Sequence, residues 1–247
     1  MHTHIFRFVD MYKAALIFII SIFTLLSVKA QVTKHVDSKE FSSLIKSGNG
    51  IILDVRTSQE YSQGHIKNST LISTRDRKFA EKVSLLQKDK PIYVYCLTGA
   101  RSRSVANYLS RKGYSKVYNL KRGVMEWQQF GYALTKSANP IASSNKTYNQ
   151  SEFNTLLKSK NVVLIDFHAT WCAPCKQLSP IIEKLQKDYT GKATIKKVDI
   201  TANKTIKESY NIASIPGLIL FKNGKQVWKH TGLISYADLS KVINQYL

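Results

Sequence analysis

The hydrophobic pattern of the chain alternates between short apolar runs and amphipathic segments. Apolar runs bounded by polar residues occur at 51–53, 92–95 and 162–165. Such runs predict strands that are buried on both faces of a parallel sheet. Elsewhere apolar residues recur at helical spacing, as in 75–87 and 176–189. This alternation predicts an α/β fold in which helices cover both faces of a parallel sheet.

A polar stretch without periodicity, 133–147, interrupts this pattern and predicts a linker. A length of 247 residues suits either one large or two small domains. We therefore place one domain at 36–132 and a second at 148–247. Both begin with a helix that turns into a buried strand ending on an aspartate. Because their later motifs differ, we infer shared local architecture and no duplication.

The N-terminus resembles a signal for export. Ala14–Val28 is almost entirely apolar, Lys13 precedes it, and Val28-Lys29-Ala30 offers small residues at the cleavage positions. The apolar run is shorter than the roughly 18–20 residues that span a bilayer. We therefore predict a signal peptide at 1–30, cleaved after Ala30, and a periplasmic or otherwise exported protein. The alternatives are an uncleaved membrane anchor and a start at Met11.

The formal net charge of +21 raises the question of a nucleic-acid partner. The lysines are spread along the chain, and no basic block is interleaved with aromatic residues. We therefore expect a solvated basic surface and no nucleic-acid partner. A positive field can still raise the local concentration of small anions.

Two cysteines, Cys172 and Cys175, lie where the strand at 162–165 leads into the helix at 176–189. Free backbone N–H groups and the positive end of the helix dipole stabilise a thiolate there. Pro174 suits a first helical turn. Cys175 is about one turn from Cys172, so it can close a disulfide with Cys172 or resolve a mixed disulfide. A zinc site would need further Cys or His ligands at suitable spacing, so a redox pair is favoured.

At these residues the chain resembles the thioredoxin family. Trp171-Cys172-Ala173-Pro174-Cys175 matches the family motif Trp-Cys-Gly-Pro-Cys with one change. The resemblance implies a mixed sheet, thiol–disulfide exchange, and contact of Trp171 with substrates. It also implies that Asp166 assists proton transfer to and from the second cysteine, with Lys197 nearby. Ser214-Ile215-Pro216 matches the segment whose cis-proline packs against the cysteines. His168, Ala173 and Gly217 depart from the commonest family residues.

The third cysteine, Cys96, also lies between a strand and a helix. The loop from Leu97 to Arg101 contains a glycine, and its successive N–H groups can form a nest for an anion. The helix N-terminus and Arg101 add positive charge. A lone cysteine is usually a small buried hydrophobic residue, but this loop favours a reactive thiolate or persulfide.

Around Cys96 the chain resembles the rhodanese family. The likeness rests on three stretches of the sequence. An early motif runs from Asp54-Val55-Arg56 to Gly64-His65-Ile66, the active-site motif runs from Tyr95 to Ser102, and a closing motif runs from Asn119 to Trp127. The resemblance implies a parallel sheet and a sulfurtransferase in which Cys96 becomes a persulfide. Its substrate loop would comprise Leu97, Thr98, Gly99 and Ala100, with Arg101. Related phosphatases and arsenate reductases have one more residue between Cys and Arg. The four residues between Cys96 and Arg101 therefore match the loop length of a sulfurtransferase. Asp54, Arg56 and His65 are expected to be structural.

We therefore predict an exported thiol–disulfide oxidoreductase of the protein-disulfide-reductase type, coupled to a sulfurtransferase domain. The alternative is a redox enzyme whose rhodanese-like domain is a non-catalytic docking module. The redox domain could also oxidise its substrates, since the sequence does not give a potential. Expected partners are proteins carrying disulfides or persulfides, small sulfur anions such as thiosulfate, and an upstream thiol donor. We expect no cofactor and no metal.

Overall fold

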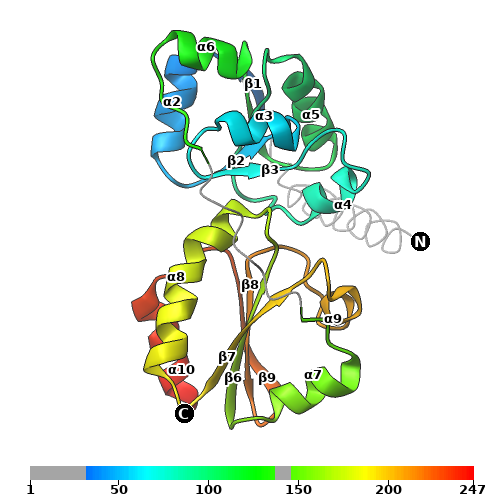
Figure 1. Ribbon diagram of the computed structural model, residues 1–247, viewed down its shortest axis with the longest axis vertical. Coiled ribbons are helices and arrows are strands. Elements are labelled where there is room, and N and C mark those ends of the chain that lie inside the picture. Colours follow the sequence, from blue (N-terminus) through cyan, green and yellow to red (C-terminus); the bar gives the residue numbers. More distant parts are fainter. Residues whose placement is uncertain (1–31, 137–145) are drawn as a thin grey trace, which may run out of the picture. The chain divides into compact units, whose positions relative to one another are not determined.

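A computed structural model describes residues 32–136 and 146–247, which form two domains with a sheet each (Figure 1). The predicted signal peptide at 1–30 and the middle of the predicted linker, 137–145, lie outside the described residues. Among the described helices, none combines the length and apolar character needed to cross a membrane.

The first domain contains a five-stranded sheet in which every pairing is parallel. The strand order is β1-β5-β4-β2-β3, which confirms the predicted α/β class. The strands are β1 (Val32–Val36), β2 (Ile51–Asp54), β3 (Ser69–Leu71), β4 (Ile92–Tyr95) and β5 (Lys116–Leu120). Every residue of the central strand β4 is buried, as its apolar run predicts.

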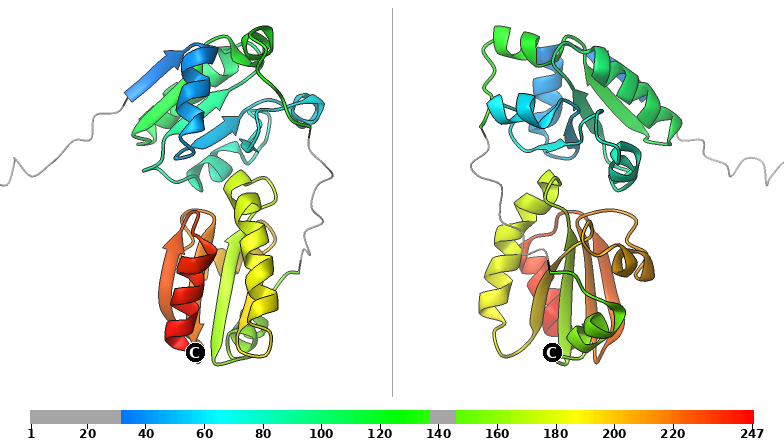
Figure 2. Two further views of the ribbon diagram at one scale, coloured as in Figure 1. Left: turned by 90° about the vertical axis from the view of Figure 1, so that its left-hand side faces the viewer. Right: turned by 45° about the vertical axis from the view of Figure 1, so that its right-hand side comes forward.

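Helices cover both faces of this sheet (Figures 1 and 2). They are α2 (Ser38–Lys46), α3 (Ser58–Gln63), α4 (Phe79–Ser84), α5 (Ala100–Arg111) and α6 (Gly123–Gln129). On one face, Phe41 of α2 and Trp127 of α6 pack edge to face, with ring centroids 6.1 Å apart. On the other face, Val83 of α4 and Leu109 of α5 are fully buried in a second apolar cluster. The two clusters fix the sheet between the helices.

The sequence pattern missed β1 and overestimated α4. Only Val36 of β1 is fully buried, because β1 is an edge strand that pairs with β5 alone. Its apolar signal is correspondingly weak. The helix predicted over 75–87 is confined to Phe79–Ser84. Before it, the Asp76 carboxylate accepts a hydrogen bond from the Lys78 N–H at 2.8 Å, which favours a turn over a helix.

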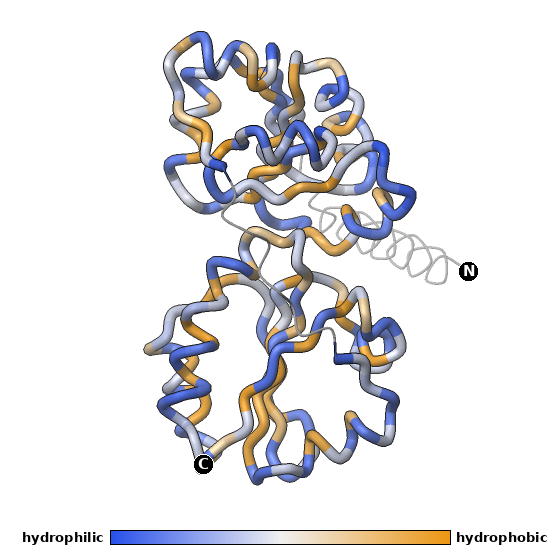
Figure 3. Tube along the Cα trace, viewed as in Figure 1, coloured by the Kyte–Doolittle hydropathy of each residue, from blue (hydrophilic) through white to orange (hydrophobic). Residues whose placement is uncertain are grey.

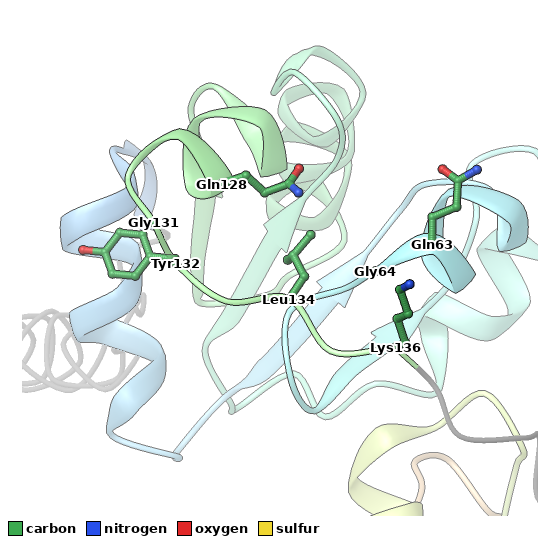
Figure 4. Close-up of a pocket in the computed structure, with 7 residues that line it drawn as sticks. All are labelled: Gln63, Gly64, Gln128, Gly131, Tyr132, Leu134 and Lys136. Carbon is green, nitrogen blue, oxygen red and sulfur yellow. The ribbon is translucent and has the colours of Figure 1, made fainter.

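Residues 133–136, which the sequence analysis assigned to the linker, pack against the first domain. Thr135 forms an isolated antiparallel bridge with His65, and the Trp127 indole donates to the carbonyl of Ala133 at 3.2 Å. A cavity of about 390 Å³ lies beside this segment, and Figure 4 shows the side chains that line it. Its lining residues are Gln63, Gly64, Gln128, Gly131, Tyr132, Leu134 and Lys136. None of them is a cysteine or a carboxylate, so we assign no chemistry to this cavity.

The second domain contains a four-stranded mixed sheet of order β7-β6-β8-β9. The strands are β6 (Val162–His168), β7 (Thr194–Asp199), β8 (Gly217–Lys222) and β9 (Lys225–Thr231). β6 is parallel to β7 and antiparallel to β8. Asn223 and Gly224 both have positive φ, 52° and 77°, and join β8 to β9 in a tight hairpin. This hairpin makes the sheet mixed, as predicted.

Four helices flank this sheet: α7 (Gln150–Leu157), α8 (Ala173–Asp188), α9 (Lys204–Ser209) and α10 (Tyr236–Tyr246). Figures 1 and 2 show α8 and α10 against one face of the sheet and α7 and α9 against the other. The central strands are hydrophobic along much of their length, whereas the helices are amphipathic (Figure 3). The buried strand β6 therefore provides a rigid base for the loop that leads from its end to α8.

Candidate active sites

The paired cysteines lie where β6 leads into α8, as the sequence predicts. Cys172 is the N-cap residue of α8, and the N–H of Cys175 donates to its sulfur at 3.2 Å. The two cysteines form a disulfide, and Pro174 occupies the first turn of the helix. A thiolate of Cys172 would therefore be stabilised by the N–H of Cys175 and by the helix dipole. Trp171 immediately precedes the pair.

Pro216 lies at the same end of the sheet as the cysteine pair. The Ile215–Pro216 peptide bond is cis, and Pro216 immediately precedes β8. The first residue of β8, Gly217, pairs with Phe167, the penultimate residue of β6. The register therefore brings the cis-proline segment beside the strand end from which the Cys172 loop departs.

Asp166 is a buried carboxyl group in the middle of this sheet. Its side chain is fully buried, and neither carboxyl oxygen has a hydrogen-bond partner among the described residues. Burial raises the pKa of Asp166 to about 7, although the positive charge of Lys197 opposes the shift. Lys197 is the register partner of Asp166 on β7, and its ammonium donates to the hydroxyl of Ser179. Asp166 can therefore exchange a proton near neutral pH.

His168 ends β6 and is a second titratable group in this region. Burial lowers the pKa of His168, and the charge of Lys197 lowers it further. A neutral imidazole therefore adds no positive charge next to the cysteine loop at neutral pH.

Replacement of Asp166 by asparagine is expected to stabilise the second domain at pH 8 by about 4 kcal/mol, because asparagine places no charge in the buried site. The size of the effect follows from the pKa shift of Asp166, since each pKa unit corresponds to about 1.36 kcal/mol. The folded-state pKa of about 7 lies above the ordinary 3.8. Wild type therefore has its full stability below about pH 4 and loses stability as the pH rises through 7. The Asp166→Asn variant lacks this loss. Scanning calorimetry of the full chain should show a higher transition temperature for the second domain at pH 8 and little change at pH 4.

The exposed Glu208 provides a control for this measurement. Glu208→Gln removes a carboxylate without removing a buried one, so its transition temperature should match wild type at both pH values. An equal gain at pH 4 and pH 8 for Asp166→Asn would contradict the assignment of the pH dependence to this carboxyl group.

Cys96 follows β4 and is buried at the base of a loop that donates hydrogen bonds to its sulfur. The N–H of Gly99 lies 3.1 Å from the sulfur, and the hydroxyl of Ser102 lies 3.4 Å from it. Burial raises the pKa of the Cys96 thiol, but hydrogen bonds from Ser102, Thr98 and Gly99 outweigh it, so the pKa is below its ordinary value. This loop favours the thiolate, as the sequence pattern predicts.

The start of α6 and the residue Lys121 just before it pack against the backbone of the Cys96 loop. The N–H of Val124 donates to the carbonyl of Cys96 at 2.9 Å, and the N–H of Met125 donates to the carbonyl of Leu97 at 3.1 Å. Gly99 has a φ of 92°, and a Cβ there would lie 1.9 Å from the carbonyl oxygen of Lys121. Only glycine permits this approach. Ala100 begins α5, and Leu97 is one of the few exposed large apolar residues.

Arg101 does not present a free cation. Its guanidinium binds both carboxylate oxygens of Glu60 on α3, at 2.5 and 3.0 Å. The hydrogen bonds from Arg101 lower the pKa of Glu60 to about 2. The sequence analysis expected Arg101 to hold an anion beside Cys96, whereas the structure shows a partner of opposite charge already bound to it. Glu60 and Ser102 are therefore site residues to which the sequence analysis assigned no role, although both lie within its motifs.

Asp54, Arg56 and His65 make the kind of structural contacts that the sequence analysis expected of them. Arg56 forms a buried ion pair with Asp54 at 2.7 Å and donates to the carbonyl of Gly64 at 2.7 Å. The ring of His65 stacks on Tyr61 with centroids 3.8 Å apart. These contacts tie the end of β2 to the loop after α3. The described residues also contain no cluster of three or more His, Cys, Asp or Glu that could hold a metal.

Comparison with known proteins agrees with this division of the chain. A family model described as a rhodanese-like domain matches residues 37–130, and one described as thioredoxin matches residues 144–245. The chain is a rhodanese-like domain followed by a thioredoxin domain. This combination indicates a thiol redox protein with a rhodanese-like module. Through its second domain it belongs to the thioredoxin family.

Individual relatives match this second domain. A thioredoxin of Staphylococcus epidermidis is 42% identical over 97 residues, which cover 39% of this chain and 92% of that protein. A thioredoxin of Staphylococcus aureus is 41% identical over 97 residues, with the same coverage of both chains. A solved structure of Plasmodium falciparum thioredoxin is 34% identical and has a TM-score of 0.38, covering 41% of this chain and 99% of that chain.

Proposed function

We propose that this chain is an exported protein-disulfide reductase whose rhodanese-like domain forms a persulfide on Cys96. The observation that carries the sulfurtransferase half is the loop around Cys96. Gly99 and Ser102 donate to the sulfur, and the thiol has a lowered pKa despite its burial. A thiolate at the end of a parallel strand is a competent nucleophile toward sulfane sulfur.

The loop supplies the nucleophile for the first half of the sulfur-transfer reaction, in which the persulfide forms. The Cys96 thiolate attacks the outer sulfur of thiosulfate, the S–S bond breaks, and sulfite leaves with the electron pair. The product is a Cys96 persulfide, whose terminal sulfur takes the negative charge. The loop N–H groups donate to that sulfur in place of water.

The two halves can be coupled through their cysteines. The Cys172 thiolate attacks the inner sulfur of the Cys96 persulfide, hydrosulfide leaves, and a Cys96–Cys172 disulfide forms. Cys175 then attacks Cys172, which releases Cys96 as a thiolate and forms the Cys172–Cys175 disulfide. An upstream dithiol must reduce that disulfide before the next turn. Tethering both sites in one chain supports the step, because a short linker gives effective concentrations on the order of millimolar.

Export is proposed from the signal-peptide pattern at 1–30, which lies outside the described residues. Intact mass of the protein isolated from its own cells should correspond to a chain that begins at Gln31. A mass that includes residues 1–30 would instead indicate an uncleaved segment.

Replacement of Cys96 by serine is expected to abolish thiocyanate formation from thiosulfate and cyanide, because Cys96 is the free cysteine of the described residues. The assay compares wild type with Cys96→Ser in the full chain. Reduction of insulin disulfides by the same Cys96→Ser preparation reports on the second domain and should match wild type, and calorimetry of the full chain controls for folding of the first domain. Thiocyanate formation by neither protein would reject thiosulfate as the sulfur donor and favour a docking role for the first domain.

A further inference from the structure

Asp166 and Lys197 lie on the same face of the second sheet, on neighbouring strands. Leu164 and Ile195, two residues before them on β6 and β7, belong to the apolar cluster that contains residues of α8. Because side chains alternate between the two faces of a strand, Asp166 and Lys197 share the face that α8 covers. Their register pairing makes them direct neighbours on that face.

The ammonium of Lys197 is held by two side chains of α8. It donates to the hydroxyl of Ser179 and lies 3.9 Å from the carboxylate of Glu183. The hydroxyl of Ser179 donates in turn to the carboxylate of Glu183 at 3.0 Å. A hydroxyl that donates to a carboxylate is a stronger acceptor for an ammonium, so the three groups form a relay. Asp166, by contrast, accepts no hydrogen bond in the part of the chain that the structure describes.

The two carboxyl groups that compete for this ammonium differ in their exposure. Asp166 is fully buried, whereas the side chain of Glu183 is 58% exposed. A buried carboxylate would gain more from an ammonium partner, because the effective dielectric constant around it is lower. The hydrogen bond to the buried hydroxyl of Ser179 offsets that gain and keeps the ammonium on the α8 side.

The other groups around Asp166 do not replace the charge of this lysine. Its register partner on β8 is the apolar Leu218, and α10 contributes apolar and aromatic residues to the same cluster. His168 lies two residues further along β6, and burial lowers its pKa. Asp199, the register partner of His168, accepts hydrogen bonds from Thr201. The lysine supplies the charge that opposes burial in setting the pKa of Asp166.

We propose that Ser179 and Glu183 are positioning residues of the reductase site. They hold the Lys197 ammonium away from Asp166, so that this carboxyl group can accept the proton of Cys175 near neutral pH. The inference rests on the proposed reductase function. In the release step, the Cys175 proton passes to the Asp166 carboxylate, and the Cys175 thiolate attacks the sulfur that holds the substrate. The bond to the substrate sulfur breaks, and the substrate thiolate leaves with the electron pair.

Replacement of Ser179 by alanine is expected to release the Lys197 ammonium toward Asp166. The pKa of Asp166 should then fall by about 1 to 3, the range for a carboxyl group beside an opposite charge. The measurement is a carbon-13 NMR pH titration of the disulfide form of the full chain, labelled at the aspartate carboxyl carbons. Asp166→Asn assigns the signal. Identical titration curves for wild type and Ser179→Ala would overturn the proposal.

Ser179→Thr distinguishes the hydroxyl from the packing of this side chain. Threonine keeps an acceptor for the ammonium, so this variant should titrate like wild type. If it titrates like Ser179→Ala instead, the hydroxyl is not the cause and the proposal is wrong. The matched control is Ser240→Ala on α10, because the buried hydroxyl of Ser240 has no partner within the described ranges. This control should leave the titration of Asp166 unchanged.

The lysine itself provides a second test. Without the ammonium, Ser179→Ala has no charge to release toward Asp166. The Lys197→Met, Ser179→Ala double variant should therefore titrate like Lys197→Met alone. A lower pKa of Asp166 in the double variant than in Lys197→Met would show that Ser179 acts by another route and would overturn the proposal.

The release step can be measured with a mixed disulfide between Cys172 and thionitrobenzoate, in a Cys96→Ser background. The mixed disulfide is formed at pH 4, where Cys175 stays protonated, and the pH is then raised to 7. Release of thionitrobenzoate should be about fivefold slower in Ser179→Ala, because Asp166 becomes a weaker base. A lowered pKa of Asp166 with an unchanged release rate would reject the role in proton transfer. Absence of insulin reduction by wild type would instead reject the reductase function, and the titrations would still test how Lys197 is held.

Discussion

Replacement of Cys172 by serine is expected to lower the rate of insulin disulfide reduction at least ~1,000-fold, because the nucleophile is lost. The N-cap position of α8 directs the N–H of Cys175 toward the Cys172 sulfur, so the structure stabilises a thiolate there. A serine hydroxyl is not ionised at neutral pH and cannot form a disulfide. The measurement is the initial rate of insulin precipitation with dithiothreitol as the reductant. The matched control is Cys96→Ser, which removes the other candidate nucleophile and should reduce insulin at the wild-type rate.

The Cys175→Ser variant separates attack from resolution. Without Cys175, a mixed disulfide on Cys172 has no partner in the α8 turn to release it. After loading with thiosulfate, peptide mapping under non-reducing conditions should recover a peptide pair joined through Cys96 and Cys172. The same loading of a Cys96→Ser, Cys175→Ser double variant should yield no such pair. If the joined peptides do not form under persulfide load, the coupling between the two domains is wrong, although the reductase function stands.

Replacement of Gly99 by alanine is expected to reduce sulfur transfer at least ~100-fold and to destabilise the first domain by about 3 kcal/mol or more. Gly99 has a φ of 92°, and an added Cβ would lie 1.9 Å from the carbonyl oxygen and 2.6 Å from the carbonyl carbon of Lys121. Both atoms are backbone, so the loop must move. The same loop directs the N–H of Gly99 at Cys96. Thiocyanate formation and calorimetry of the full chain measure the two effects.

Gly113 provides the matched control for the Gly99 substitution. It follows α5 with a φ of 86°, but a Cβ there would meet nothing within 4 Å. Gly113→Ala therefore has the same left-handed backbone strain without the clash, and it should cost about 1 kcal/mol and leave sulfur transfer intact. Similar activities for the Gly99→Ala and Gly113→Ala variants would show that the close approach to Lys121 does not shape the site. Insulin reduction should be normal in both variants.

The positions of both candidate cysteine sites could be predicted from local sequence patterns. Short apolar runs mark β4 and β6, and cysteines follow each run at the start of a helical pattern. The strand-to-helix junctions of Cys96 and Cys172 are local features, so hydrophobic periodicity and turn chemistry were enough to predict them. The Asn223-Gly224 hairpin was predictable for the same reason. The edge strand β1 was missed because its apolar signal is weak. The helix containing α4 was predicted too long because its true start depends on a side-chain hydrogen bond in the preceding turn.

The electrostatics of these sites, in contrast, depends on contacts between segments that are far apart in the sequence. Glu60 and Arg101 are 41 positions apart and meet because α3 follows β2 and α5 follows β4, which are neighbouring parallel strands. The steric requirement at Gly99 comes from the carbonyl of Lys121, which follows β5. The raised pKa of Asp166 reflects its burial in the sheet. Charge pairing, steric closure and desolvation depend on which distant segments are packed together, and spacing along the chain does not specify that packing.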